Sequence, residues 1–188
     1  MQTSYRVLVL AFAVLFAGLP AAARAAGFVI SANGEADNAL LPAAMGFDKM
    51  SSDGVHSCGG TNKAPGFSWE NPPAKTTSYA ILEVDPDGRA GLGVNHWVIY
   101  NIPGAATGIS AAEIAAGKYT PGRGTGEFVG YRGPCPPLGD APHHYIVTLF
   151  ALDAPPAFAT GLDHDGVVAA MKGHVLGATT TIMRFQRK

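Results

Sequence analysis

The chain has 188 residues, with 13 Lys and Arg against 14 Asp and Glu and a formal net charge of −1. Charged residues make up 14%, below the roughly 25% usual in soluble domains, and 24 Gly with 14 Pro indicate many turns. This composition excludes a coiled coil, and a hydrophobic content of 47% argues against a disordered chain. Because no long basic run is present, the charge gives no reason to expect a nucleic acid partner.

The first 25 residues have the pattern of a secretory signal peptide. Arg6 is followed by an apolar run from Val7 to Leu19, and the A-x-A sequence at residues 23–25 is typical of a cleavage site. The run is shorter than the ~20 residues that a bilayer span needs, which leaves an uncleaved membrane anchor as the less favoured alternative. We therefore expect residues 26–188 to form an exported mature chain with no transmembrane segment.

Export would place the two cysteines, Cys58 and Cys135, in an oxidising compartment. Since they are the only pair, an intramolecular disulfide is the favoured state, with two buried free thiols or an intermolecular bridge as alternatives. Two cysteines are too few for a four-cysteine zinc site.

Five segments between the Gly and Pro clusters have the composition or alternation of β-strands, at residues 28–31, 78–85, 96–102, 144–152 and 179–186. In the third segment, a period of two places Trp97 and Ile99 on one face and His96, Val98 and Ile102 on the other. No internal repeat or linker divides residues 26–188, so we expect a single domain.

Two helical patterns interrupt the strands. Ser110 is a candidate N-cap for a helix over residues 111–116, and Glu113 would complete a capping box. Asp163 or Asp165 would cap a second helix over residues 166–175. The Gly- and Pro-rich stretch at residues 120–142 has a length typical of loops that build a site or a lid. The predicted fold is mainly β, an antiparallel β-sandwich with one or two short peripheral helices.

Four polar side chains fall at the ends of predicted strands. If the second and third strands pair, Asp85 and His96 lie side by side, and His143 and Tyr145 share one face of a later strand. Imidazole N–H and phenol O–H groups can donate hydrogen bonds to an anion, so the four residues predict a small anion pocket. A carboxylate beside an imidazole favours its protonated form, and we predict that binding strengthens as the pH falls through the histidine range.

The motifs around these residues resemble those of a known family. They are D-P-D at residues 85–87, HWVIYNIP at 96–103, GYRGPCPPLGDAPHHY at 130–145, CGGTNKAPGFSW at 58–69 and AAMKGHVL at 169–176. In this order they resemble the phosphatidylethanolamine-binding protein family, in its bacterial Raf kinase inhibitor-like branch, over nearly the whole mature chain.

The resemblance implies a β-rich fold with a small pocket for phosphate, phosphoethanolamine or carboxylate groups. The residues that match this pocket are Asp85, His96, His143 and Tyr145, with Pro136 and Pro137 shaping its wall. It also implies a secreted, periplasmic bacterial protein that needs no cofactor and modulates or inhibits a partner protein. The family includes dimers, so a homodimer is one of the alternatives, although no residue in the sequence indicates an interface.

The chain departs from the eukaryotic members beside the pocket. Asn95 stands where they commonly have a histidine, and Val94 stands where an aromatic residue would precede it. The chain also ends soon after Phe185, without their long C-terminal helix. We therefore predict neither Raf-type kinase inhibition nor specificity for membrane lipids for this chain.

The same residues allow other interpretations. Two histidines and a carboxylate also form a metal triad, or a buried structural network without a ligand. A hydrolase of a small phosphorylated or acylated molecule, with a histidine as general base, is the alternative function, although no G-x-S-x-G element is present. Arg132, in the site loop, is a candidate for gating the ligand or an ordinary surface arginine. We assign no catalytic and no metal-binding residue.

Overall fold

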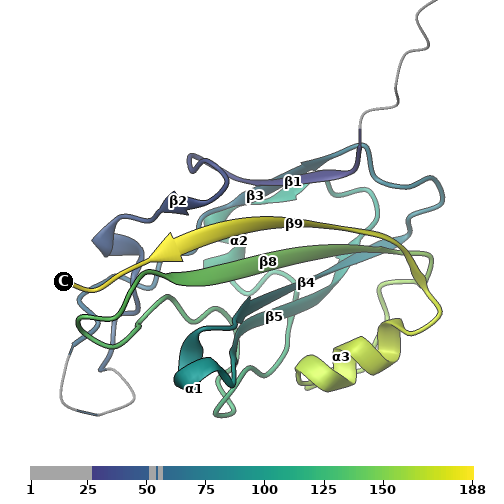
Figure 1. Ribbon diagram of the computed structural model, residues 1–188. Helices are drawn as coiled ribbons and strands as arrows, with labels where there is room; N and C mark the ends of the chain where they lie inside the picture. Colours follow the sequence, from purple (N-terminus) through teal and green to yellow (C-terminus); the bar gives the residue numbers. More distant parts are fainter. Residues whose placement is uncertain (1–26, 51–53, 55–56) are drawn as a thin grey trace, which may run out of the picture.

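The computed structural model describes residues 27–50, 54 and 57–188, whose strands form two β-sheets (Figure 1). The larger sheet has the order β2-β9-β8-β4-β5-β7, with strands β2 (Ala39–Leu40), β4 (Ser78–Asp85), β5 (Val94–Pro103), β7 (Thr120–Pro121), β8 (His143–Leu152) and β9 (Val175–Phe185). The smaller sheet has the order β1-β3-β6, with strands β1 (Val29–Ala32), β3 (Phe67–Glu70) and β6 (Gly108–Ile109). The pairing of β2 with β9 is parallel and the other named pairs are antiparallel, which confirms the predicted mainly β class.

The predicted signal peptide, residues 1–25, lies outside the described residues. In the part of the chain that is described, no helix is both long enough and apolar enough to cross a membrane.

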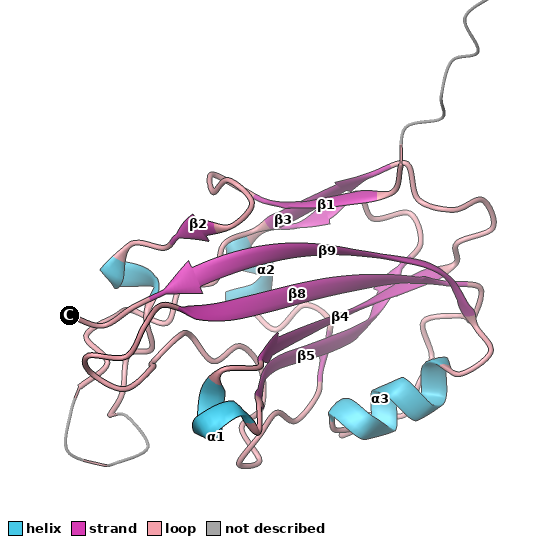
Figure 2. Cartoon of the chain, in the orientation of Figure 1, coloured by secondary structure: helices cyan, strands magenta, loops and turns pink. Residues whose placement is uncertain are grey.

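The larger sheet is covered on both faces, as Figure 2 shows. On its inner face, Ile81 and Val147 pack in one buried cluster with Phe67 of the smaller sheet. On its outer face, Val98 packs in a second cluster with Val167 of α3 (His164–Met171). Burial on both faces explains why the central strand β4 reads as a nearly continuous apolar run.

Two irregularities in β5 change which face its side chains occupy. His96 and Ile102 were predicted to share a face with Val98, and this was wrong: Ile102 lies in the inner cluster, and the His96 ring packs against Tyr145 of the inner face. The pairing of β5 with β4 shifts register near each end, and Asn101 has a positive φ of 58°. Each extra residue reverses the faces of the side chains beyond it, and one of these bulges directs His96 to the inner face.

The second predicted helix is shorter than expected. Asp163 caps α3 by accepting the N–H of Gly166, as one of the two candidates predicted, but α3 ends at Met171 rather than at residue 175. Gly173, with φ of 86°, turns the chain out of the helix, and β9 begins at Val175, four residues before the predicted start at 179. Two short helical segments were not expected: η1 (Ala43–Met45) and α1 (Gly88–Gly91).

The first predicted helix, α2 (Ala111–Ala115), has the predicted capping box. The Ser110 hydroxyl accepts the N–H of Glu113 at 3.2 Å, and the Glu113 carboxylate accepts the N–H of Ser110 at 2.8 Å. We expect Ser110→Ala to lower the free energy of unfolding by about 1 kcal/mol, measured by urea denaturation. Ser110→Thr, which keeps the hydroxyl, should lose less, and equal losses in the two variants would contradict the capping role.

Candidate functional site

The structure brings the four predicted polar residues together at one end of the larger sheet. Asp85 ends β4, His96 is the third residue of β5, and His143 begins β8 with Tyr145 two positions on. Because β4 lies between β5 and β8, the Asp85 carboxylate lies between the two imidazoles. The predicted neighbourhood of Asp85 and His96 is confirmed.

The Asp85 carboxylate is buried, bonds to His143 and lies near His96. Its Oδ2 lies 2.8 Å from His143 Nδ1 and 3.8 Å from His96 Nε2, while Oδ1 accepts the N–H groups of Asp87 and Gly88 at 2.9 and 3.0 Å. Burial acts to raise the pKa of Asp85, but the interactions with His96 and His143 outweigh it and lower that pKa. Asp85 is therefore an ionised acceptor at neutral pH.

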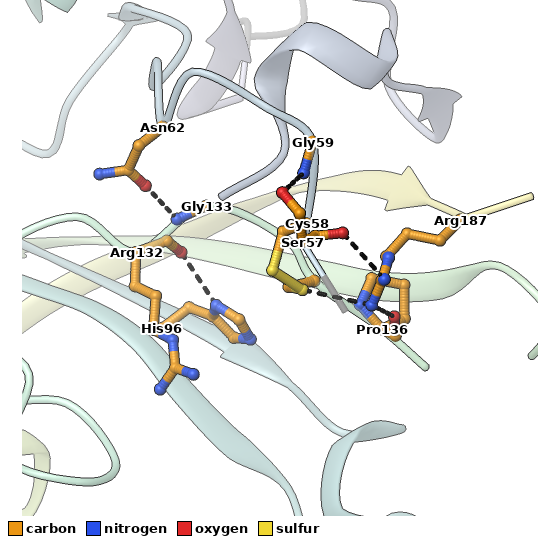
Figure 3. The surroundings of a disulfide bond; sticks show 10 residues. Ser57, Cys58, Gly59, Asn62, His96, Arg132, Gly133, Pro136 and Arg187 are labelled. Atoms are coloured by element: carbon orange, nitrogen blue, oxygen red, sulfur yellow. Dashed lines mark hydrogen bonds between the residues drawn. A yellow bond between two sulfur atoms is a disulfide. The ribbon is translucent and has the colours of Figure 1, made fainter. Parts of the chain in front are cut away.

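The partners of the two rings fix which nitrogen carries the proton. His96 Nδ1 lies 2.9 Å from the carbonyl oxygen of Arg132, and His143 Nδ1 lies 2.8 Å from Asp85 Oδ2 (Figure 3 shows the His96 bond). Since a carbonyl or carboxylate oxygen only accepts, both rings are protonated at Nδ1. In a neutral ring Nε2 then has a lone pair, and it donates to an anion only after the ring takes up a second proton.

Tyr145 lies behind the histidines rather than on the cavity wall. Its side chain is 0% exposed, and its ring meets that of His96 edge-on, with the centroids 5.0 Å apart. Burial first, and then the charges of Asp85 and Glu83, raise the pKa of Tyr145, so the phenol stays protonated. Among the described residues its hydroxyl has no hydrogen-bond partner.

The histidines border a cavity of about 450 Å³, a volume suited to a small ligand. Pro136 and Pro137 line it, as expected for the residues that shape its wall. Thr125 and Gly126 also line it, so the stretch at residues 120–142 builds this site from two parts of its length. The remaining charged residues of the lining are Asp87, Arg89, Arg132 and Asp140, of which sequence reasoning had singled out Arg132.

The turn after β4 orients the backbone toward Asp85. Arg89 and Ala90 both have left-handed backbone conformations, with φ of 53° and 57°. A Cβ on Gly88 would lie 2.7 Å from Val94 Cγ2 and 3.1 Å from Asp85 Oδ2, so only glycine lets this N–H reach the carboxylate. The D-P-D-G sequence was a signal for this turn that the sequence analysis did not use.

The predicted disulfide between Cys58 and Cys135 is present (Figure 3). Arg187 lies beside it, almost fully buried, and donates to the carbonyl oxygens of Pro136 at 3.1 Å and Ser57 at 3.0 Å. The wall of the cavity at Pro136 is thus held by a covalent bond on one side and by the C-terminal segment on the other.

A second buried acid lies next to the site. Glu83, two residues before Asp85 in β4, is 0% exposed, and among the described residues neither of its oxygens has a hydrogen-bond partner. Burial raises the pKa of Glu83 to about 8, and the charge of Asp85 adds to the increase. Glu83 is therefore mainly protonated at neutral pH. Sequence analysis missed it, although a lone acid inside the apolar run of residues 79–84 was a visible signal.

Within the described ranges, no three His, Cys, Asp or Glu side chains are grouped so that they could hold a metal ion.

Comparison with known proteins identifies the family. A model described as phosphatidylethanolamine-binding protein matches residues 33–186. A UPF0098 protein of Methanothermobacter thermautotrophicus is 38% identical over 136 residues, which cover 70% of this chain and 88% of that protein. A Mycobacterium tuberculosis relative that carries the lipoprotein name LppC is 39% identical over 118 residues, covering 60% of this chain and 56% of that protein.

A solved structure agrees with these matches. The crystal structure of Escherichia coli YbcL, described as a member of the mammalian PEBP family, has a TM-score of 0.75 and 26% sequence identity, and covers 87% of this chain and 100% of that one. The family model spans most of the sequence, and the fold agrees with that of a solved member. This chain therefore belongs to the phosphatidylethanolamine-binding protein family, as its ordered motifs indicated.

Proposed function

We propose that this protein is an exported binding protein that holds a small anionic group in the cavity beside Asp85. The observation that carries the proposal is the pair of imidazoles, His96 and His143, on one ionised buried carboxylate, with both Nδ1 atoms already engaged within the protein. In a protonated ring, the Nε2–H can donate a charge-assisted hydrogen bond to a bound anion. Phosphate, phosphoethanolamine and carboxylate groups are the expected ligands.

Export and a protein partner belong to the same proposal. The signal-peptide pattern, the disulfide and the lipoprotein name of one relative support export, with the bacterial periplasm as the expected location. A partner protein would be modulated or inhibited when it presents a phosphoryl or carboxylate group to the cavity. Membership of the family supports this role.

The binding prediction is tested by isothermal titration with inorganic phosphate and phosphoethanolamine at pH 5.5 and 7.5. Because the Nε2 donors need an extra proton, we expect tighter binding at pH 5.5, with a change of up to about tenfold per pH unit for each proton taken up. His143→Ala and Asp85→Ala should each weaken binding by roughly tenfold or more, the usual effect of losing a charge-assisted hydrogen bond.

His174→Ala is the matched control, since His174 is exposed, pairs with Asp153 and lies outside the cavity lining. Affinity that stays constant between the two pH values, or that survives in both site variants, would refute the anion pocket. Turnover of a phosphomonoester or ester by the wild type, lost in His143→Ala, would instead support the hydrolase.

A further inference from the structure

The Asp140 carboxylate lies beside Nε2 of His143, the atom to which an anion would bind. Asp140 lines the cavity, and its Oδ2 lies 3.5 Å from His143 Nε2, on the opposite side of the ring from Asp85. Half of the Asp140 side chain is exposed. The distance exceeds that of an ordinary N–H···O hydrogen bond, so no fixed bond holds the Asp140 carboxylate to the ring.

The backbone of Asp140 is held on two sides, which places the carboxylate near His143. Its N–H donates to the carbonyl oxygen of Pro137 at 3.4 Å, and its own carbonyl oxygen accepts from Gln186 Nε2 at 2.9 Å. Gly139, with φ of 85°, makes the turn immediately before it. The position of Asp140 therefore follows from a turn and from the C-terminal segment together.

The other two carboxylates of the cavity are satisfied within the protein. Asp85 accepts two backbone N–H groups and the His143 ring, and Asp87 accepts the backbone N–H and ring of His144 at 2.8 and 2.9 Å. With neutral imidazoles, three lining carboxylates face two guanidinium groups, so the lining has a charge of about −1. An anion entering this cavity meets repulsion, and Asp140 lies nearest to the nitrogen that must receive it.

We propose that the Asp140 carboxylate occupies the anion-accepting edge of His143 and selects ligands by charge. The inference rests on the proposed anion binding and specifies the ligand class further. An incoming group must displace the carboxylate or approach beside it, and the Coulomb cost of that approach grows in proportion to the ligand charge. Asp140 therefore favours monoanions, such as carboxylates and phosphodiesters, over dianionic phosphomonoesters.

Two probes of similar shape separate these classes at pH 7.5: dimethyl phosphate, a monoanion, and methyl phosphate, mainly a dianion. We expect Asp140→Asn to bind dimethyl phosphate roughly fivefold more tightly than the wild type, the effect of removing one charge at about 4 Å in water. For methyl phosphate the gain should be about the square of that factor, roughly 25-fold. Both affinities are measured by isothermal titration.

Asp140→Glu keeps the charge and should stay near the wild type, and Asp153→Asn removes an exposed charge from outside the cavity and should change neither affinity. Equal gains for the two probes, no gain, or weaker binding by Asp140→Asn would overturn charge selection while leaving anion binding intact. If neither the folded wild type nor folded Asp140→Asn binds any probe at pH 5.5 or 7.5, anion binding itself fails, and charge selection fails with it.

Discussion

We expect the free energy of unfolding of the Cys58→Ala/Cys135→Ala variant to be about 4 kcal/mol lower than that of the oxidised wild type. The disulfide joins residues 77 positions apart, and a loop of that length restricts the unfolded chain strongly in the chain-entropy model. For a chain of this size, the loss corresponds to a decrease of roughly 10 °C in the melting temperature. Urea denaturation gives the free energy, and scanning calorimetry gives the temperature.

Reducing agent provides the internal control for this prediction. Wild-type protein in dithiothreitol should match the double variant, and the variant itself should be insensitive to the reagent. A loss of less than about 1 kcal/mol would mean that the unfolded chain is already restricted without the bond, contrary to the chain-entropy account.

The second large effect concerns Glu83, and here stability should fall as the pH rises. Burial raises the pKa of Glu83 from its ordinary value of 4.5 to about 8, so between these values the folded state keeps a proton that the unfolded chain releases. The contribution is fully present below pH 4.5 and is lost as the pH rises through about 8. Across this window the slope approaches 1.4 kcal/mol per pH unit, so several kcal/mol depend on this one proton.

Glu83→Gln preserves the shape of the side chain and removes its titration. The difference in unfolding free energy between Glu83→Gln and the wild type should therefore grow in favour of the variant from pH 5 to pH 8 and then level off. Asp85, Tyr131 and Tyr145 are present in both proteins, so most of their effect cancels in this difference. A difference that is independent of pH would show that Glu83 ionises in the fold as it does in the unfolded chain.

Much of the fold could be predicted from the sequence, because strand-like runs and helix-capping residues are signals carried by neighbouring residues. Strand-like runs between Gly and Pro clusters located β4, β8 and β9, although β9 begins earlier than predicted, and Ser110 and Asp163 marked both main helices. The short strands β2, β3, β6 and β7 were missed because two to four residues carry too little alternation. Their existence depends on pairing partners distant in the sequence.

The candidate site could be predicted where the family-like motifs fall on strands whose side chains alternate between two faces. Asp85, His96 and His143 meet as expected, and Pro136 and Pro137 line the cavity. The neighbourhood of Asp140 and His143 could not be read from the chain, because it depends on the turn at Gly139 and on the bond from Gln186. The bulge that turns His96 inward is likewise a property of strand pairing rather than of sequence alone.

The bonds of the C-terminal segment also determine when the cavity wall can be completed during synthesis. Gln186 and Arg187 hold the cavity wall at Asp140 and Pro136, and they follow β9, which pairs with β8 and, near its end, with β2. Gln186 and Arg187 stand directly before the last residue, Lys188, so they are synthesised after the rest of the site. During synthesis, the residues of β4, β5 and β8 are therefore present in the chain before Gln186 and Arg187 are added. A nascent chain can therefore contain the histidines and the carboxylate of the site and still lack its finished wall.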